Sequence, residues 1–530
     1  MTGFEDLNDD VLYLILDYLY LERASALRRL RLTSSRLKEF AEAVAHRSIS
    51  LVDDVVHDQF TYRLAERLTD PTDKLCHYVR DLLVVNFKGD AESYCLNNIL
   101  IAKCLEHVQR LDSFSWDSDT PIPGKTLDVL RQRFPRAQLY ANIRTIDMRL
   151  LSTTQLHRLD ISVPCLDLSN EYSISFFGVF KQALLRLVSL CHLGIDTHYN
   201  ANFGKREGRA LDRLQLPFEP GDKLPSLVSL ALRSKSYAFD TDHCKMLHAA
   251  MDCDKVQRLI IGSPNPGNFF QVFNGHLPRL THLDVSYTSI KDDPRHRRLE
   301  SLSIFVAGLV SLKSFVFRCN NLDLRADFAR LLAVRHGPTL VRLSLQAIQE
   351  NVEGPSFAGN IRTFLWKFTD LQLLDMAFPS IRSCHRCPDC EDYQWGEAKH
   401  FSFVPPLPSL RGVHLSIRAP LLDRSLYASI DKHAHCTICH LWTTFVEHPE
   451  SQLETLGIRF WRWAMNGRQP CVEELIYDTV RLRGELSVKI RHHREIPVVI
   501  YKEVWDPWDR QKFVAFEVAK DKREAGIQML

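Results

Sequence analysis

A short leucine pattern, L-x-x-L-x-L, recurs along most of the chain and limits the folds that the chain can adopt. Other aliphatic residues or Phe replace some of the leucines. The copies start at Leu156, Leu190, Leu227, Val256, Leu280, Leu312, Leu340, Leu371, Leu410 and Leu453. Successive starts are 24 to 43 residues apart, which is an uneven period of solenoid length.

Each copy predicts a short strand whose alternate apolar side chains point into a core, with the intervening side chains on the other face of a parallel sheet. The segments 303–311 and 327–337 lie between copies and are expected to form helices that cover the sheet. Weaker copies begin at Val79 and Val108 and indicate degenerate first repeats. The expected fold class is therefore α/β.

Two copies extend the pattern further. Asn320 and Leu322 occupy the turn positions of a leucine-rich repeat, and Thr288 and Ile290 occupy the same positions one repeat earlier. The other copies lack the asparagine. An irregular leucine-rich-repeat solenoid is the interpretation that we prefer, with a doubly wound α/β domain as the alternative because its strands are also short and aliphatic.

A solenoid of this kind builds an extended surface for a large partner. Polar residues at outward strand positions, and in the loops that follow, are the candidates for binding a target protein. They are His282, Asp284, Ser286, Tyr287, Lys313, Arg318, Arg342, Ser344 and Gln346. The alternative for each of them is an ordinary solvated surface.

The segment 7–19, LNDDVLYLILDYL, predicts an amphipathic helix, with Asn8 as its cap and two acidic residues in its first turn. Leu12, Leu14 and Leu16 lie off its main apolar face, so the helix needs more than one partner. Further helices are expected at 24–32 and 34–47. Three short helices bury little surface, and a docked protein would cover the remainder.

The order of residues in this region resembles an F-box, over about residues 4–50. The match consists of Leu7, Asp9-Asp10, Ile15-Leu16-x-x-Leu19, Ala26-Leu27, Leu30-Arg31-Leu32 and Ser35-Arg36-Leu37. Asn8 replaces the usual proline, and Leu37 stands where many members have tryptophan. The alternative is an N-terminal helical cap on a larger domain.

The resemblance implies a three-helix module that docks on the Skp-type adaptor of a cullin-RING ubiquitin ligase. The adaptor-binding residues that it implies are Leu7, Val11, Ile15, Leu16, Leu19, Leu27, Leu30, Leu32 and Leu37. F-box chains with irregular leucine-rich repeats are abundant in filamentous fungi.

Two cysteine groups indicate a structural zinc site. Cys384, Cys387 and Cys390 have C-x2-C-x2-C spacing, and Cys436 and Cys439 form a second C-x2-C pair with histidines beside it. Either Cys384 with Cys387 or Cys387 with Cys390 can supply the first pair. The alternative is reduced thiols without metal. With at least four candidate ligands, such a site has no open position for catalysis.

Enzyme motifs are not found. The stretch PGKT at 123–126 ends like a phosphate-binding loop, but Asp119 stands where the first glycine is required. The histidine-rich stretch at 491–495 is interpreted as a solvated basic turn. A hydrolase hidden in the repeats is a third, weaker hypothesis.

Composition excludes two partner classes. The net charge of +2 and the ordinary 25% of charged residues do not indicate a nucleic-acid-binding surface. The chain begins MTGFED, without the basic residues of an export signal, and contains no apolar run of membrane-spanning length. A cytoplasmic or nuclear protein without membrane contact is expected.

The expected organisation is an F-box at 4–50, repeats at 75–490 and a cap or tail at 491–530, where Trp505 and Trp508 flank a turn. As the resemblance implies, the chain would be a non-catalytic substrate receptor of an SCF-type ubiquitin ligase. It would hold adaptor and cullin at one end and an unknown target protein on the repeats. The alternative is a leucine-rich-repeat scaffold outside any ligase.

Overall fold

A computed structural model of the 530-residue chain places most of the residues before position 380 and several strands after it. The residues that it describes are 7–53, 58–87, 98–118, 120–144, 147–165, 170–199, 215–234, 237, 239–263, 266–287, 295–319, 323–324, 326–346, 356–357, 364–378, 407–418, 455–466, 469–482 and 485–497. They fall into two compact units, 1–312 and 313–530, which we describe separately.

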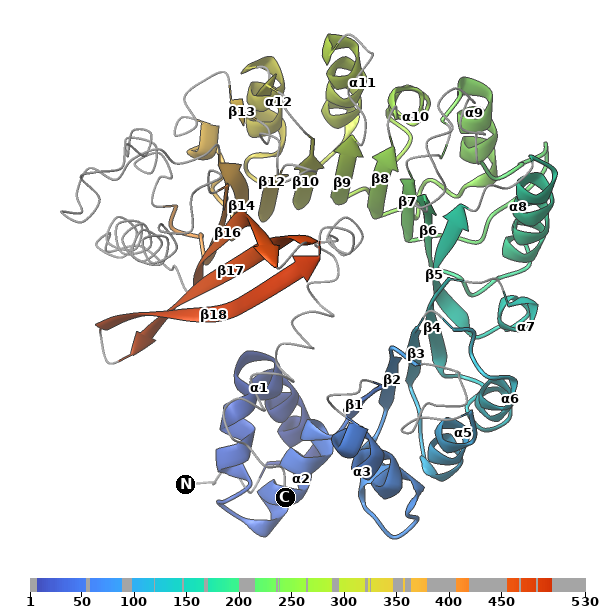
Figure 1. Cartoon of the computed structure of the whole chain (residues 1–530), viewed down its shortest axis with the longest axis vertical. Helices are drawn as coiled ribbons and strands as arrows, with labels where there is room; N and C mark the ends of the chain where they lie inside the picture. The colour runs from blue at the N-terminus through green and yellow to red at the C-terminus, as the bar shows by residue number, and fades with distance from the viewer. Residues whose placement is uncertain are drawn as a thin grey trace. The chain divides into compact units, whose positions relative to one another are not determined.

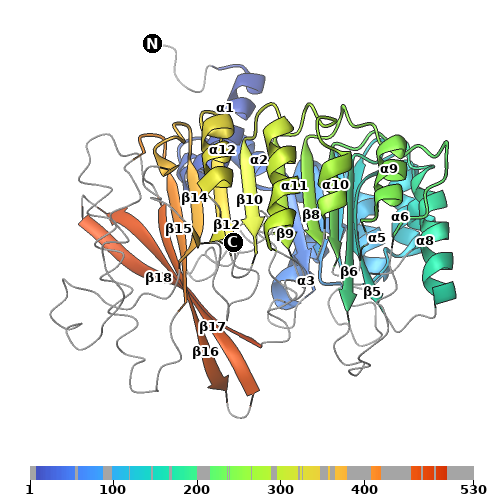
Figure 2. The same ribbon diagram turned by 90° about the horizontal axis from the view of Figure 1, so that it is seen from above.

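Nine strands of the first unit form a parallel sheet in which each strand pairs with the next along the chain (Figures 1 and 2). They are β1 (Ser48–Val52), β2 (Asp81–Val85), β3 (Ser113–Asp117), β4 (Gln138–Ile143), β5 (Leu156–Cys165), β6 (His192–Tyr199), β7 (Ser229–Ser234), β8 (Arg258–Ser263) and β9 (His282–Tyr287). Sequence order and spatial order are therefore the same.

Helices follow most of these strands. They are α3 (Asp58–Thr69), α4 (Leu75–Tyr78), α5 (Asn98–His107), α6 (Gly124–Arg133), α7 (Met148–Leu151), α8 (Asn170–Leu184), α9 (Thr241–Ala250), α10 (Gly267–Val272) and α11 (Arg295–Gly308). Figure 1 shows them on one side of the strands. Two further helices, α1 (Asp9–Leu30) and α2 (Ser35–Ala45), precede β1.

The core lies between the sheet and these helices. Leu159 and Ile161 of β5, like Leu230 and Leu232 of β7, are buried, and they alternate with polar or small residues. Because successive side chains of a strand point to opposite faces, the alternation assigns the apolar set to the helix side. The aromatic rings of α10 and the residues after it, such as Phe269, complete this core.

The second unit also contains parallel strands, and its last two strands are antiparallel. Its strands β10 (Ser314–Arg318), β12 (Arg342–Gln346), β14 (Leu373–Phe378), β15 (Gly412–Arg418) and β16 (Thr455–Asn466) are parallel. The strands β17 (Gln469–Leu482) and β18 (Glu485–Pro497) then pair antiparallel. Helix α12 (Ala326–His336) and the short strands β11 (Asp323–Leu324) and β13 (Ser356–Phe357) complete the described part.

The prediction of α/β structure with parallel strands and covering helices is confirmed. Each of the ten leucine copies leads into a strand, and the predicted helices at 303–311 and 327–337 overlap α11 and α12. Strands β1, β4, β11, β13, β17 and β18 were not predicted, because none of them carries the leucine pattern. The sheet thus begins at residue 48, before residue 75. The prediction of a turn at 491–495 is wrong, because these residues belong to β18.

The leucine pattern coincides with a recurrent pair of backbone hydrogen bonds at the start of the strands. The first residue of a copy, such as Leu227 or Val256, is buried in the turn, and the strand starts two residues later. The backbone N–H groups of Gln257 and Arg258 both donate to the carbonyl of Val228, at 2.9 and 3.1 Å. Equivalent paired bonds occur at the entries of β2, β3, β7, β9, β12, β14 and β15. They hold each repeat in register with the one before it.

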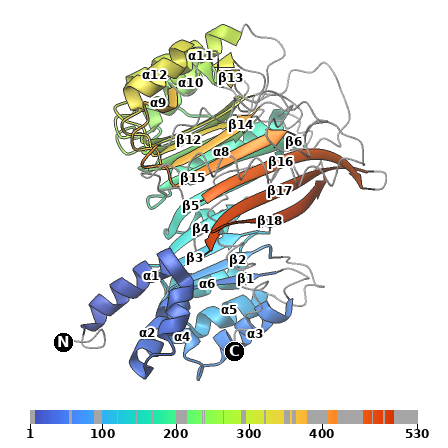
Figure 3. The same cartoon turned by 90° about the vertical axis from the view of Figure 1, so that its left-hand side faces the viewer.

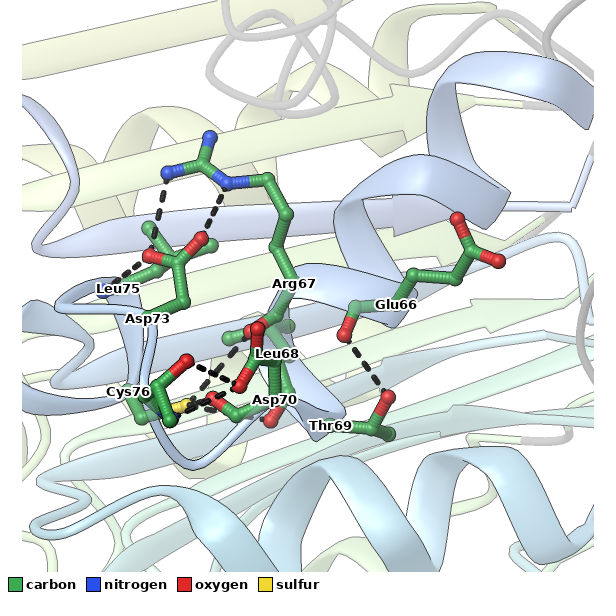
Figure 4. A network of polar contacts seen from close by, with 9 residues as sticks. Glu66, Arg67, Leu68, Thr69, Asp70, Asp73, Leu75 and Cys76 are labelled. Carbon is green, nitrogen blue, oxygen red and sulfur yellow. Dashed lines mark hydrogen bonds and ion pairs between the residues drawn. The ribbon is translucent and has the colours of Figure 1, made fainter.

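A polar network closes the first repeat between α3 and α4 (Figure 4). The guanidinium of Arg67 donates to both carboxylate oxygens of Asp73, with Nε to Oδ2 at 2.7 Å. Asp73 Oδ1 also accepts the backbone N–H of Leu75 at 2.8 Å. The hydrogen bond from Arg67 is the main reason why the pKa of Asp73 is lowered, although partial burial opposes it. The ionised carboxylate therefore fixes the turn.

We expect Asp73→Ala to lower the free energy of unfolding by about 1 to 2 kcal/mol, because it removes a charge-assisted pair and one backbone acceptor. Asp73→Asn keeps an acceptor for Leu75 and should lose less. The matched control is Asp242→Ala, since the side chain of Asp242 is 95% exposed and its ion pair with Lys245 is long. Urea unfolding followed by circular dichroism measures all three; equal losses for Asp73→Ala and Asp242→Ala would contradict the prediction.

Candidate protein-interaction surfaces

The helices α1 and α2 lie side by side and share a small apolar core (Figure 3). Leu16, Leu27, Ala41 and Val44 are buried in it, and Leu19, Tyr20, Leu30 and Phe40 pack around them. Asn8 caps α1 by accepting the backbone N–H of Asp10, and Ser34 caps α2 by accepting that of Leu37. The pair is thus built from two capped amphipathic helices.

Three ion pairs fix the position of α1 relative to its surroundings. Arg36 reaches back to Asp9 at 2.6 Å, and Arg31 pairs with Glu42 at 2.8 Å. Arg47, between α2 and β1, pairs with Asp17 of α1 at 3.0 Å and lies 3.8 Å from Asp81 of β2. Because Arg47 contacts both α1 and the sheet, it connects the helix pair to the first repeats.

An apolar stripe is exposed on the other side of α1. Val11, Leu14 and Tyr18 have relative exposures of 42%, 70% and 64%. Their spacing of i, i+3 and i+7 places them along one face of the helix. We call these three residues the α1 stripe. Large apolar side chains exposed together in this way mark an interaction site more often than isolated ones do.

The structure divides the predicted adaptor-binding residues into two groups. Leu16, Leu27 and Leu37 are buried in the chain's own core, and Leu19 and Leu30 pack against it. Leu7 and Ile15 are half-buried, whereas Val11 and Leu32 are exposed. The helix pair uses the buried leucines to hold itself together, so only the others are accessible to a partner in this arrangement. The adaptor-binding role of the nine residues stays a prediction.

The expected three-helix arrangement is also wrong. Residues 9–30 form one continuous helix of 22 residues, which joins the segments that we predicted as two helices. No Gly or Pro lies between residues 19 and 24, so nothing in the local sequence forces a break. One long and one shorter helix therefore precede the sheet.

The sheet of the first unit has a polar face on the side opposite the helices. One row across this face consists of Tyr140, Arg158, His192, Ser229, Arg258 and His282, which are register partners on β4 to β9. We call these six residues the basic row. It contains two Arg and two His side chains and no carboxylate, and apart from Ser229 its members are half-buried.

A neighbouring carboxylate orients the first arginine of the row. Arg158 Nε donates to Asp160 Oδ2 at 2.6 Å, and the two side chains are 41% and 22% exposed. On the adjacent strand, a Cβ at Gly194 would lie 2.1 Å from Asp160 Oδ1. Gly194 is thus needed for the carboxylate to lie over β6 and hold Arg158.

Histidine rings lie against one another beside this pair. His157 is the extra residue at an irregularity in the β4–β5 register, and its ring centroid is 5.4 Å from that of His192. Burial, together with the nearby Arg158, His157 and Arg258, lowers the pKa of His192 to about 4, against a smaller opposing effect of Asp160. His192 is therefore neutral at pH 7 in surroundings that favour negative charge.

The predicted target-binding residues do not form one exposed surface. Asp284, Tyr287, Arg318, Ser344 and Gln346 are buried; His282, Ser286 and Arg342 are half-buried; and Lys313 is exposed. The buried five are not accessible to a partner in this arrangement, and the target-binding role of the set stays a prediction. Strand alternation shows which sheet face a side chain leaves from but not whether solvent reaches it, and Tyr287 is in phase with the buried Val285.

Two polar side chains are buried together in the second unit. Gln346 Nε2 donates to Asp375 Oδ2, and each residue is 1% exposed. Ser344, the register partner of Asp375, is also buried. Gln346 and Ser344 therefore lie in the interior of this unit in the present arrangement.

The predicted zinc ligands Cys384, Cys387, Cys390, Cys436 and Cys439 lie outside the described residues, as do Asn320, Thr288 and the segment 498–530. Within the described part, no three His, Cys, Asp or Glu side chains are placed to hold a metal ion. Six cysteines of the described part are free thiols, among them Cys104 and Cys244, and burial raises the pKa of both to about 12.

Four residues of these surfaces were not predicted from the sequence: Leu14, Arg158, Asp160 and Arg258. A signal for the last three was present, because the copies at Leu156 and Val256 carry charged residues at the same alternating positions as the later copies. The predicted target-binding residues all belong to the copies from Leu280 to Leu340. Leu14 lies off the helix face defined by Leu7, Val11 and Ile15, so the sequence pattern does not assign it to a binding surface.

A search of known protein families found none that matches this chain, and a search of curated proteins found no relative. Among the helices that the structure describes, none combines the length and apolar character needed to cross a membrane.

Proposed function

We propose that the chain is a non-catalytic substrate receptor of an SCF-type ubiquitin ligase, with an F-box-like helix pair and irregular leucine-rich repeats. The observation that carries the proposal is the α1 stripe, an exposed apolar face on a helix pair that already has its own core. In this proposal Val11, Leu14 and Tyr18 contact a Skp-type adaptor. The strand-and-helix repeats then present a target protein to the ubiquitin-charged enzyme, so that proximity is the chain's contribution to the reaction.

The order of elements supports this division of labour. The helix pair is tied to the first strands through Arg47, which contacts Asp17 and Asp81. An adaptor held on α1 would therefore keep a defined position relative to the first repeats. A recognition subunit needs this property, since the target has to be held at a fixed distance from the enzyme that modifies it.

The test is retention of a purified Skp-type adaptor by the intact chain. We expect the triple variant Val11→Glu, Leu14→Glu and Tyr18→Glu to weaken binding at least about 100-fold, because three charges would be buried without partners. Glu is a strong helix former, so the substitutions should leave α1 intact. Circular dichroism of the variant should match that of the parent chain.

The matched control is Tyr62→Glu with Arg63→Glu on α3. Both residues are exposed, and this variant changes the net charge by the same amount as the triple variant. It should retain the adaptor fully. Retention of the adaptor by the triple variant, or no retention by the parent chain, would refute the adaptor-docking role. Adaptor binding without recruitment of cullin would instead indicate a scaffold outside the ligase.

A further inference from the structure

The basic row carries two permanent positive charges, on Arg158 and Arg258, and no carboxylate. The acidic residues of the same face, Asp160, Asp196 and Asp284, lie at other register positions, as does a third arginine, Arg233. Between the two arginines the row contains His192 and Ser229, which can donate or accept hydrogen bonds. A partner that crosses the strands along this row meets cationic groups at both ends.

The spacing of the two arginines defines the partner's shape. Arg158 is on β5 and Arg258 is on β8, three strand intervals away. Neighbouring strands are about 4.8 Å apart, so the interval is about 14 Å. An extended chain advances about 3.3 Å per residue and covers this distance in about four residues. Side chains at i and i+4 of an extended chain also point the same way.

We propose that the basic row binds an extended protein segment that carries two carboxylates about four residues apart, one for Arg158 and one for Arg258. A guanidinium has five N–H donors, so the bond from Arg158 to Asp160 leaves further donors for a bound carboxylate. Within the proposed function, this segment belongs to the target protein. The binding itself requires no adaptor.

The hydrogen-bonding groups between the arginines favour a peptide over a simple anion. The side chains of His192 and Ser229 lie beneath the middle of the proposed segment, where peptide N–H and C=O groups would pass. Ala231, in the next register row, adds little side-chain bulk next to it, whereas the carboxylate of Asp160 fills the space over Gly194. An extended backbone can therefore approach the sheet over β7.

The experiment is selection of a random 12-residue phage-displayed library on the immobilised full-length chain. We expect enrichment of Asp or Glu at positions i and i+4, and its loss for Arg158→Gln with Arg258→Gln. Arg158→Lys with Arg258→Lys keeps the charge and should keep the preference. The matched control, Arg110→Gln with Arg136→Gln, removes two exposed arginines elsewhere and should behave like the parent chain.

Two results would overturn the proposal: absence of acidic pairs among the selected peptides, or equal enrichment by the glutamine variant. If that variant does not fold, the selected peptide is synthesised with both acidic residues replaced by Gln or Asn. Its affinity for the parent chain should fall at least about 100-fold, since two charge-assisted contacts are lost. An unchanged affinity also refutes the proposal.

Calorimetry supplies an independent measurement. A carboxylate placed next to His192 should raise the pKa of the imidazole from about 4 toward its ordinary 6.5, so binding near pH 5 should take up protons. Heats measured in two buffers with different ionisation enthalpies detect this uptake, and its absence contradicts the proposal. Because no adaptor is present, these results are independent of the α1 stripe experiment, and either idea can fail alone.

Discussion

Replacing Lys181 by alanine is expected to lower the free energy of unfolding of the chain by about 3 to 5 kcal/mol. Lys181 lies on α8 and is only 3% exposed, yet it carries an ammonium group. Its Nζ is 3.0 Å from Asp222 Oδ2 and 3.4 Å from Glu219 Oε2. Alanine would leave the largely buried Asp222 carboxylate without its cation, and that is the main cost.

The two carboxylates belong to a tight turn, so the ion pair also positions a segment of backbone. Asp222 accepts the backbone N–H of Glu219 at 2.8 Å, and Gly221 has φ of +96°. Pro220 followed by Gly221 is typical of a type II turn, in which the third residue needs a positive φ. Lys181 therefore holds this turn, which precedes β7, against α8.

The double variant Lys181→Met with Asp222→Asn is the control. It removes both charges, keeps an acceptor for the Glu219 N–H and fills most of the lysine's volume. We expect it to lose clearly less stability than Lys181→Ala, because no buried charge is left alone. Urea unfolding of both variants, with hydrogen exchange of residues 170–187 and 215–227, gives the comparison. A larger loss for the double variant would contradict this assignment.

The ion pair between Lys181 and Asp222 stabilises the fold only within a defined pH range. Burial alone would lower the pKa of Lys181, but the hydrogen bond and charge of Asp222, with help from Glu219, raise it above its ordinary 10.5. Burial alone would raise the pKa of Asp222, but the Glu219 N–H and Lys181 hold it below 3.8. The stabilisation is thus complete between about pH 4 and pH 10 and is lost at either extreme.

The second large effect is acid destabilisation through His243. The imidazole is 5% exposed and stacks on Phe218. Its Nε2 atom is 3.0 Å from the hydroxyl oxygen of the buried Tyr237. Burial lowers the pKa of His243 to about 4, although Asp240 slightly opposes this. The hydroxyl of Tyr237 accepts the N–H of Leu216, so its own O–H is available to donate to the neutral ring.

A lowered histidine pKa stabilises the folded state above the unfolded value of 6.5, and this contribution is lost as the pH falls toward 4. A shift of this size corresponds to about 3 kcal/mol. We expect the parent chain to lose that much stability between pH 7 and pH 4 beyond what the variant His243→Phe loses. The variant is less stable at pH 7, because the hydroxyl of Tyr237 loses its hydrogen bond to the imidazole.

Urea midpoints at several pH values test this prediction. His192, whose pKa is also lowered to about 4, titrates in the same range in both chains, so the difference between them isolates His243. Parallel pH curves for the two chains would show that His243 does not titrate as proposed.

Local sequence was enough to determine the repeat. The alternating apolar residues of each copy, such as Leu230 and Leu232, specify a strand with one buried face, and the spacing between copies leaves room for a covering helix. These features depend on nearest neighbours in the chain, so they can be predicted without knowing which repeats meet. Buried and more exposed residues also alternate in β1, SISLV. It was not predicted as a strand, because it lacks the leading leucine of the pattern.

Tertiary structure decided which polar and apolar faces remain accessible. Leu14 and Leu16 look alike in the sequence, but only contact with α2 makes Leu16 a core residue and leaves Leu14 exposed. Likewise Arg158 and Asp284 both leave the polar side of the sheet, yet one is half-exposed and the other is buried. Periodicity determines the direction of a side chain, whereas its accessibility depends on elements that pack there from elsewhere in the chain.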